Sequence, residues 1–257
     1  MARIHLFEFE DQSWFPDFLR NYGTDYLQFI SNKTKLYKPV VSLLIKSLQK
    51  SKTNSIIDLG SGGGGGLLWL NSELLKEVPD LKITLTDFYP NIRAFEYTRK
   101  QAGNFDFRTA SVDARKVPPE LKGVRTQFLS LHHFKPEDAK LILQNAVDSN
   151  SSIAIFEGQE RSVMSIIGML LSPLTVFVTT PFIKPFNFGR LFFTYIVPLV
   201  PLFTIWDGVV SSLRTYSVKE MNQLVARLEN KDQFDWEIGK IKNGPSVILY
   251  LLGNIRC

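Results

Sequence analysis

The chain of 257 residues has a single cysteine, Cys257, at its last position. One thiol excludes a disulfide within the chain and any cluster of cysteine ligands for a metal ion. The first residues include acids and lack an apolar stretch long enough for a signal peptide. We therefore expect a cytoplasmic protein that binds no metal.

Acidic residues are absent between residues 162 and 206, where the only charges are those of Lys184 and Arg190. The uncharged run 162–183 is long enough to span a bilayer. Prolines would interrupt straight helices in this segment; they are Pro173, Pro181, Pro185, Pro198 and Pro201. Three interpretations stay open: a buried cap over a site, a surface that dips into a membrane, and a true membrane span.

A basic stripe interleaved with aromatic residues is also absent, so we expect no nucleic-acid partner. The net charge is only +5, and many of the lysines lie between residues 33 and 52, where a solvated helix face explains them better than a binding patch. Hydrophobic residues make up 44% of the chain, which is enough for a sizeable globular core.

The run from Ser55 to Leu70 is the most informative part of the sequence. A short apolar strand is followed by the glycine-rich turn 60–66 and then by an apolar helix start. Glycine permits positive φ and lets a ligand approach the backbone. Such a strand–turn–helix unit serves enzymes that use NAD and enzymes that use S-adenosylmethionine (SAM).

Asp58, two residues before Gly60, distinguishes these two cofactors. A dinucleotide would place its pyrophosphate at the turn, and a carboxylate there would oppose that anion. SAM carries an ammonium and a sulfonium, which a nearby carboxylate favours. The pattern therefore favours SAM, and a nicotinamide-dependent oxidoreductase is the disfavoured alternative.

Strand and helix patterns alternate after residue 54, which predicts an α/β fold with a mostly parallel sheet flanked by helices. We expect strands at 55–59, 82–87, 105–110, 125–131, 152–157, 234–242 and 246–252. We expect helices at 66–77, 91–102, 136–147 and 217–229. Residues 1–54 form a predicted helical cap, and residues 55–257 form a predicted cofactor-binding domain that carries the apolar insertion 162–206 after the fifth strand.

Acids follow the second and third predicted strands, at the sheet edge where open α/β sheets bind ligands. Asp87 can accept hydrogen bonds from two ribose hydroxyls, or it can simply cap the helix that follows. Asp113 can accept a hydrogen bond from an adenine amino group. Together with Asp58 they form a series at matching strand ends.

This series resembles the class I SAM-dependent methyltransferases over residues 55–157. Asp58 to Gly64 is similar to the first motif of that family, and His132-His133 is similar to the end of its fourth strand. Residues 206–216 resemble a group of bacterial members. The resemblance implies a Rossmann-like fold with a seven-stranded sheet, SAM as cofactor and S-adenosyl-L-homocysteine (SAH) as product. It implies cofactor contacts from Asp58, Gly60, Ser61, Gly62, Asp87, Phe88, Asp113, Ala114 and Ser130. The run of five glycines departs from the family pattern and is a poor helix opener.

A methyl acceptor that begins protonated needs a base. His132 and His133 are candidates because histidine titrates near neutral pH, although ordering the cofactor site is an alternative role. Glu157, at the end of the fifth strand, competes with them. Trp14, Asp207, Arg214 and Tyr216 are candidates for substrate binding; a buried polar network that fastens the insertion to the sheet is the alternative for the last three.

The sequence lacks the residues that methyltransferases for three other classes of acceptor use. The fourth strand ends without an Asn/Asp-Pro-Pro-Tyr/Phe motif, no internal cysteine is present, and an acidic metal cluster is missing near the fourth and fifth strands. We therefore predict methyl transfer to a hydrophobic small molecule or lipid-like acceptor, with the insertion 162–206 as part of its pocket. The alternative is a non-catalytic scaffold that docks on a membrane or a partner through that insertion.

Overall fold

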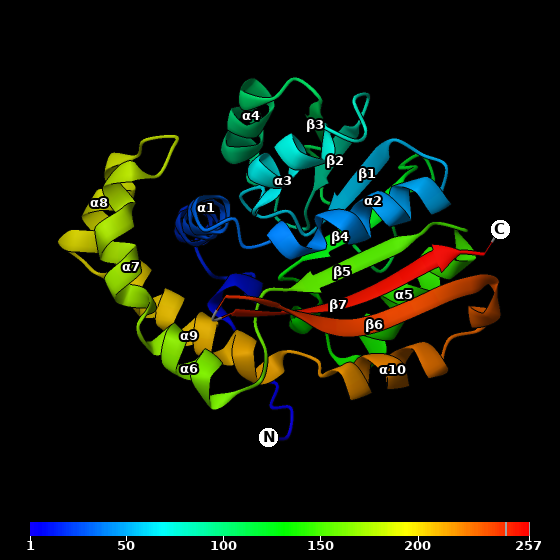
Figure 1. The fold of residues 1–257 in the computed structure, drawn as a ribbon. Coiled ribbons are helices and arrows are strands. Elements are labelled where there is room, and N and C mark those ends of the chain that lie inside the picture. The colour runs from blue at the N-terminus through cyan, green and yellow to red at the C-terminus, as the bar shows by residue number, and fades with distance from the viewer. Residues whose placement is uncertain (245, 257) are drawn as a thin grey trace.

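The sheet has seven strands in the order β3-β2-β1-β4-β5-β7-β6 (Figure 1). The computed structural model describes residues 1–244 and 246–256, so Cys257 lies outside the described residues. The strands are β1 (Ser55–Leu59), β2 (Lys82–Thr86), β3 (Phe105–Phe107), β4 (Val124–Phe128), β5 (Ile153–Glu157), β6 (Phe234–Asn243) and β7 (Ser246–Ile255). Strand β7 runs antiparallel to both of its neighbours, β5 and β6, whereas the pairs among β1 to β5 are parallel. The predicted α/β fold with a mostly parallel, seven-stranded sheet is confirmed.

The central strands are buried on both faces, as strands in a helix-covered parallel sheet must be. Every residue of β4 and β5 is buried. In β1, Ile56 packs into the cluster on one face and Ile57 into the cluster on the other. The parallel register places Leu59 opposite Thr86, so the residues that follow β1 and β2 emerge at the same edge.

Two layers of helices cover the sheet. Leu44, Leu70 and Phe95 pack against one face, and Ile142 and Met221 pack against the other. The first layer contains α2 (Val41–Lys50), α3 (Leu67–Leu74) and α4 (Ile92–Gln101); the second contains α5 (Pro136–Asp148) and α10 (Val218–Ala226). The chain also forms short 3-10 helices at η1 (Phe9–Asp11), η2 (Lys38–Val40), η3 (Leu131–His133) and η5 (Lys231–Gln233).

Residues 1–54 divide between two parts of the molecule. Helix α2 is part of the core that covers the sheet, through Leu44 and Leu48. Helix α1 (Asp17–Lys33) instead packs against the insertion, with Tyr22 and Tyr26 in the same apolar cluster as Val176. Residues 1–54 thus form helices, but α2 belongs to a helix layer that covers the sheet. Only α1 and the segment before it lie outside these layers.

The insertion after β5 is a set of short helices. They are α6 (Val163–Leu170), α7 (Ser172–Thr179), η4 (Thr180–Phe182) and α8 (Phe188–Tyr195), followed by the longer α9 (Leu199–Arg214). Pro173 and Pro181 stand in the first turns of α7 and η4, where a proline costs no helix hydrogen bond. Figure 1 shows these helices as an arch at one side of the molecule, with α1 between α7–α8 and the sheet.

We expect Gly63→Ala to loosen the packing of α1 on the glycine-rich turn. A Cβ atom at Gly63 would lie 2.6 Å from the carbonyl oxygen of Thr24, and this backbone atom cannot move without shifting α1. The substitution should lower the free energy of unfolding by about 1–3 kcal/mol, as measured by urea denaturation. Gly168→Ala is the control, because its Cβ meets nothing within 4 Å. Equal stability of the Gly63 variant and the parent would contradict this packing.

Candidate functional site

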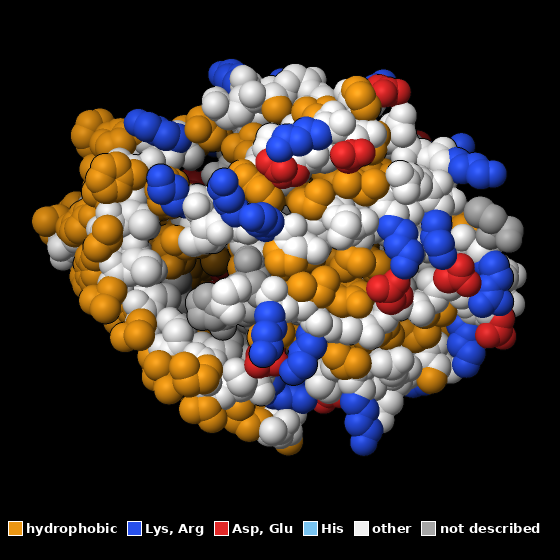
Figure 2. All heavy atoms as spheres, in the orientation of Figure 1, with side chains coloured by type: hydrophobic (Ala, Val, Ile, Leu, Met, Phe, Trp, Pro, Cys, Tyr) orange, Lys and Arg blue, Asp and Glu red, His pale blue; other side chains and the backbone are white. Residues whose placement is uncertain are grey.

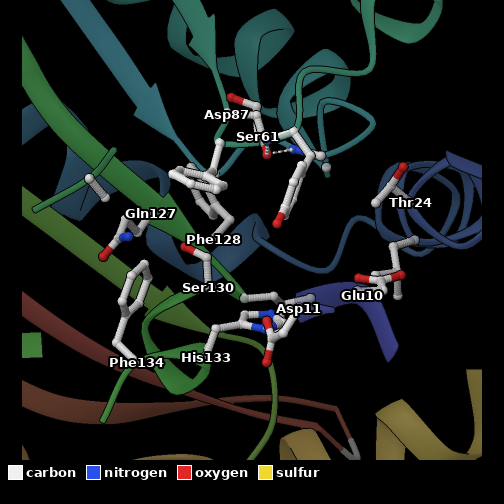
Figure 3. A pocket seen from close by; sticks show the side chains of 18 of the residues that line it. Glu10, Asp11, Thr24, Ser61, Asp87, Gln127, Phe128, Ser130, His133 and Phe134 are labelled. Carbon is white, nitrogen blue, oxygen red and sulfur yellow. Dashed lines mark hydrogen bonds and ion pairs between the residues drawn. The ribbon is translucent and has the colours of Figure 1, made fainter. Parts of the chain in front are cut away.

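A cavity of about 470 Å³ opens at the carboxyl ends of the parallel strands (Figure 3). One wall is the turn after β1 together with Asp87 after β2. A second wall follows β4 and includes Ser130, His133 and Phe134. The third comes from the N-terminal segment and α1, which contribute His5, Glu10, Asp11, Arg20, Asn21, Thr24, Leu27 and Ser31.

The glycine-rich turn presents bare backbone to this cavity. Gly60 and Gly62 have φ values of 70° and 53°, in the left-handed region that glycine enters without strain. The amide of Ser61 donates to the Thr86 carbonyl over 2.9 Å, and the amide of Gly62 donates to Asp87 over 2.7 Å. The turn is therefore tied to the end of β2, and a ligand can approach its backbone.

Asp58 lies beneath the turn, buried, and does not line the cavity. Its carboxyl accepts hydrogen bonds from the hydroxyls of Ser61 (2.7 Å) and Thr126 (2.6 Å). Burial raises its pKa to about 7. This position differs from the expected cofactor contact: Asp58 shapes the turn from below, and its charge discriminates between cofactors less than an exposed carboxylate would.

Asp87 and Asp113 both line the cavity, as do their neighbours Phe88 and Ala114. The two carboxylate oxygens of Asp87 accept from the amides of Gly62 and Tyr89, and each keeps a lone pair for a ligand. Burial raises the pKa of Asp87. Hydrogen bonds from Arg115 hold the Asp113 carboxylate and lower its pKa. The structure thus brings together the residues that follow β1, β2 and β3.

Glu10 is a wall residue that sequence analysis did not identify. Its carboxyl lines the cavity, and burial together with the nearby Asp207 raises its pKa to about 8. In Figure 3, Glu10 and Thr24 lie at one side of the view, and Gln127 and Phe134 lie at the opposite side. The signal present in the sequence was the group of acids at residues 8, 10 and 11, to which we assigned no role in a site.

A cluster of charged groups extends from the cavity wall, at Asp11 and His133, to Glu8 and Arg214 behind it. The Arg214 guanidinium donates to Glu8 over 2.9 Å and to Asp11 over 2.6 Å. Asp11 also contacts His133 Nδ1 at 2.7 Å. Burial opposes protonation of His133, but the carboxylates of Glu8 and Asp11 outweigh it and raise its pKa to about 10. His133 is therefore a cation at neutral pH, not the base that the sequence suggested.

His132 and Glu157 are buried behind the cavity rather than lining it. Glu157 accepts from the backbone amide of His132 and contacts its Nδ1 at 2.8 Å. Both residues were candidate bases, but neither reaches a bound molecule from this position. The pair instead fixes the end of β4 against the end of β5.

Glu8, His132 and His133 offer ligand atoms within 4.8 Å of one another, which is close enough to hold a metal ion. Arg214 already donates to the Glu8 carboxylate, and His133 is cationic. Arg214 and His133 thus compensate the negative charge of Glu8, so we interpret this group as a network of ion pairs between side chains. The absence of a bound metal stays a prediction.

The predicted substrate residues do not line the cavity. Asp207 accepts from the backbone amides of Phe9 and Glu10, and Arg214 donates to the carbonyl of Leu6. These bonds fasten the N-terminal segment to α9. The alternative role given above was also a polar network, but one that fastens the insertion to the sheet. Tyr216 donates to the carbonyl of Phe134 over 2.7 Å, and Trp14 is 65% exposed to solvent.

The insertion likewise does not form the pocket wall that its sequence suggested. Among the described residues, none between 162 and 206 lines the cavity. Helix α1 stands in between, because its Thr24, Leu27 and Ser31 line the cavity while Tyr22 and Tyr26 pack against the insertion.

The fold of this chain is similar to that of several solved structures. PigF with SAH is similar with a TM-score of 0.50 and 16% identity, over 93% of this chain and 62% of that one. Human N-acetylserotonin methyltransferase with SAM (TM-score 0.48, 16% identity) covers 90% of this chain and 56% of its own. The mitomycin 7-O-methyltransferase MmcR (0.47, 17%) covers 89% and 54%. The chain spans less than two thirds of each.

Neither a family model nor a curated protein sequence matches the chain. At these identities the structural comparisons show the fold alone. The chain has the Rossmann-like fold of the class I methyltransferases, as the sequence predicted.

We expect the ion pairs of His133 to give a pH-dependent contribution to stability. Its folded pKa of about 10 lies above the ordinary value of about 6.5. The contribution is therefore complete below about pH 6.5 and is lost as the pH rises through about 10. His133→Asn should lower the free energy of unfolding at neutral pH, and this difference from wild type should shrink toward pH 10 in urea denaturation.

His5→Asn provides the control for this experiment. Burial and Arg214 lower the folded pKa of His5 to about 4, and its ordinary pKa is about 6.5, so its charge changes in neither the folded nor the unfolded state between about pH 8 and 10. Its effect on stability should be constant over that range. A constant effect of His133→Asn as well would contradict the protonated state assigned to His133.

Proposed function

We propose that this chain is a SAM-dependent methyltransferase that acts on a small molecule with an apolar body. The observation that carries the proposal is the convergence of three consecutive strand ends on one cavity. The bare turn follows β1, Asp87 follows β2, and Asp113 belongs to the loop after β3. PigF, which has the same fold, was solved with SAH, the product that methyl transfer leaves.

The cavity residues fit the parts of SAM. Asp87 keeps lone pairs for two ribose hydroxyls, and the backbone from Gly60 to Gly62 would face the methionine part. Val112 and Ala114 would flank the adenine, with Asp113 at its edge. When bound, SAM supplies a methyl group carried on a sulfonium.

The wall after β4 and the wall formed by the N-terminal segment and α1 would hold the acceptor. Leu27 and Phe134 offer apolar contact, which supports a hydrophobic or lipid-like acceptor. The Glu10 carboxyl lines the cavity and accepts no hydrogen bond from the other described residues, and we propose that it takes the proton that the acceptor loses. Such a proton is typical of a hydroxyl or amine group. We also propose that the protein acts in the cytoplasm and without a nucleic-acid partner.

SAH should bind to the purified protein in a calorimetric titration, whereas NAD should not. Asp87→Ala should weaken SAH binding about tenfold or more, because a charge-assisted hydrogen bond to a ribose hydroxyl is worth about 1.5–3 kcal/mol. Asp106→Ala is the matched control: Asp106 lies on β3 and its side chain is 77% exposed. Absence of SAH binding to folded protein would overturn the proposed cofactor.

Glu10→Gln should lower the rate of methyl transfer by roughly 10²-fold or more, because loss of a general base costs about that much. In the wild type the rate should rise with pH through about 8, where Glu10 loses its proton. The variant should lose this rise and keep its affinity for SAH. Transfer of the labelled methyl group from SAM to a panel of apolar phenols and lipids provides the measurement. An unchanged pH profile would remove Glu10 from this role.

A further inference from the structure

The outer side of the insertion exposes an unusual amount of apolar surface. Figure 2 shows hydrophobic side chains gathered along the edge that α6, α7 and α8 form. Phe188 is 80% exposed and Met164 is 74% exposed. We define the docking face by six strongly exposed apolar side chains: Met164, Leu174, Val178, Phe182, Phe188 and Ile196. A contiguous surface of this kind marks a binding site for a protein or a membrane.

The charges at this face favour an anionic occupant. The segment 162–206 contains no acid, and its one exposed charge is Lys184. Arg190 is buried and paired with Asp25, so it does not contribute to the surface. Arg93 of α4 is exposed and donates to the carbonyl of Phe186, which adds a second cation beside the face. Cations at the edge of an apolar surface attract anionic lipid headgroups.

The chemistry of the face fits lipid better than a second protein surface. Protein interfaces carry about one hydrogen bond per 100–200 Å² and a polar rim. The six defining side chains of the docking face have no polar atom other than the methionine sulfur. Tyr195, 44% exposed, is the last residue of α8 and precedes Ile196 of the docking face. Such aromatic residues concentrate where a membrane meets water.

The inner sides of the insertion helices pack against the domain. The run Val163–Phe182 is long and apolar enough to cross a membrane, by length and composition. However, α6 and α7, which make up most of this run, are attached to the rest of the domain. Their inner sides pack on α9, and Val176 is buried against α1. Asp207 ties α9 to the N-terminal segment, so the insertion cannot leave the domain without breaking these contacts.

We propose that the docking face binds the surface of a bilayer that contains anionic phospholipid, with α6, α7 and α8 lying in the plane of the interface. The helices satisfy their own backbone hydrogen bonds, which is a requirement for contact with hydrocarbon. This binding does not depend on methyl transfer or on the identity of a cofactor.

Flotation of the full chain with vesicles tests the proposal. Vesicles of phosphatidylcholine with phosphatidylglycerol should carry the protein upward, and vesicles of phosphatidylcholine alone should carry less of it. Val178→Asp combined with Phe188→Asp should reduce binding about tenfold or more, because each change removes a buried apolar group and adds a charge. Leu141→Asp is the matched control, since Leu141 is 50% exposed on α5, away from the face. Lys184→Glu should weaken the preference for anionic vesicles.

Other outcomes would overturn the proposal. Wild-type protein that stays with the buffer, or equal loss of binding in the Leu141 variant and the docking-face variant, would exclude a lipid site at this face. A dimer in sedimentation velocity that the docking-face variant dissociates, without vesicle binding, would assign the face to a second copy of the chain. Circular dichroism of each variant shows whether the fold is intact, and the SAH titration tests the proposed function separately.

Discussion

The buried contact of Arg214 with Glu8 and Asp11 holds together parts of the chain that are more than 200 residues apart. The guanidinium is 3% exposed and the Glu8 carboxylate 1%. A buried charge that loses its partner costs several kcal/mol, so this contact strongly fixes the N-terminal segment. That segment carries Glu10 and Asp11 into the cavity wall. The site is therefore complete only when the first residues return to the end of α9.

Two parts of the molecule form the walls of the cavity. The sheet supplies rigid strand ends, where the Gly62 amide of the turn donates a hydrogen bond to the Asp87 carboxylate. The N-terminal segment and α1 supply the opposite wall, and they depend on packing against the insertion. The insertion thus supports the site from behind while its outer side remains apolar and exposed. Docking on a membrane would bring the molecule close to hydrophobic acceptors without placing lipid-facing residues in the cavity.

Local sequence patterns were sufficient to predict the strands of the sheet. The apolar run 55–59 predicts a strand that the structure has at the same bounds, and the other strands agree within a few residues. Gly60, Gly62, Asp87 and Asp113 were also placed at the cavity, because carboxyl ends of parallel strands meet at one edge. The depth of Asp58 could not be inferred, since it depends on Ser61 and Thr126 closing over its carboxyl.

The sequence by itself determined the fold class and the strand-end residues, because each follows from neighbours along the chain. Only the tertiary structure decided the roles of distant residues. The charge of His133 depends on Glu8 and Asp11, which lie more than 120 residues earlier. Glu10 reaches the cavity because Asp207 binds the backbone beside it. Such long-range contacts leave no periodic signal in the sequence, so burial, pKa and access to the cavity emerge only when the chain is folded.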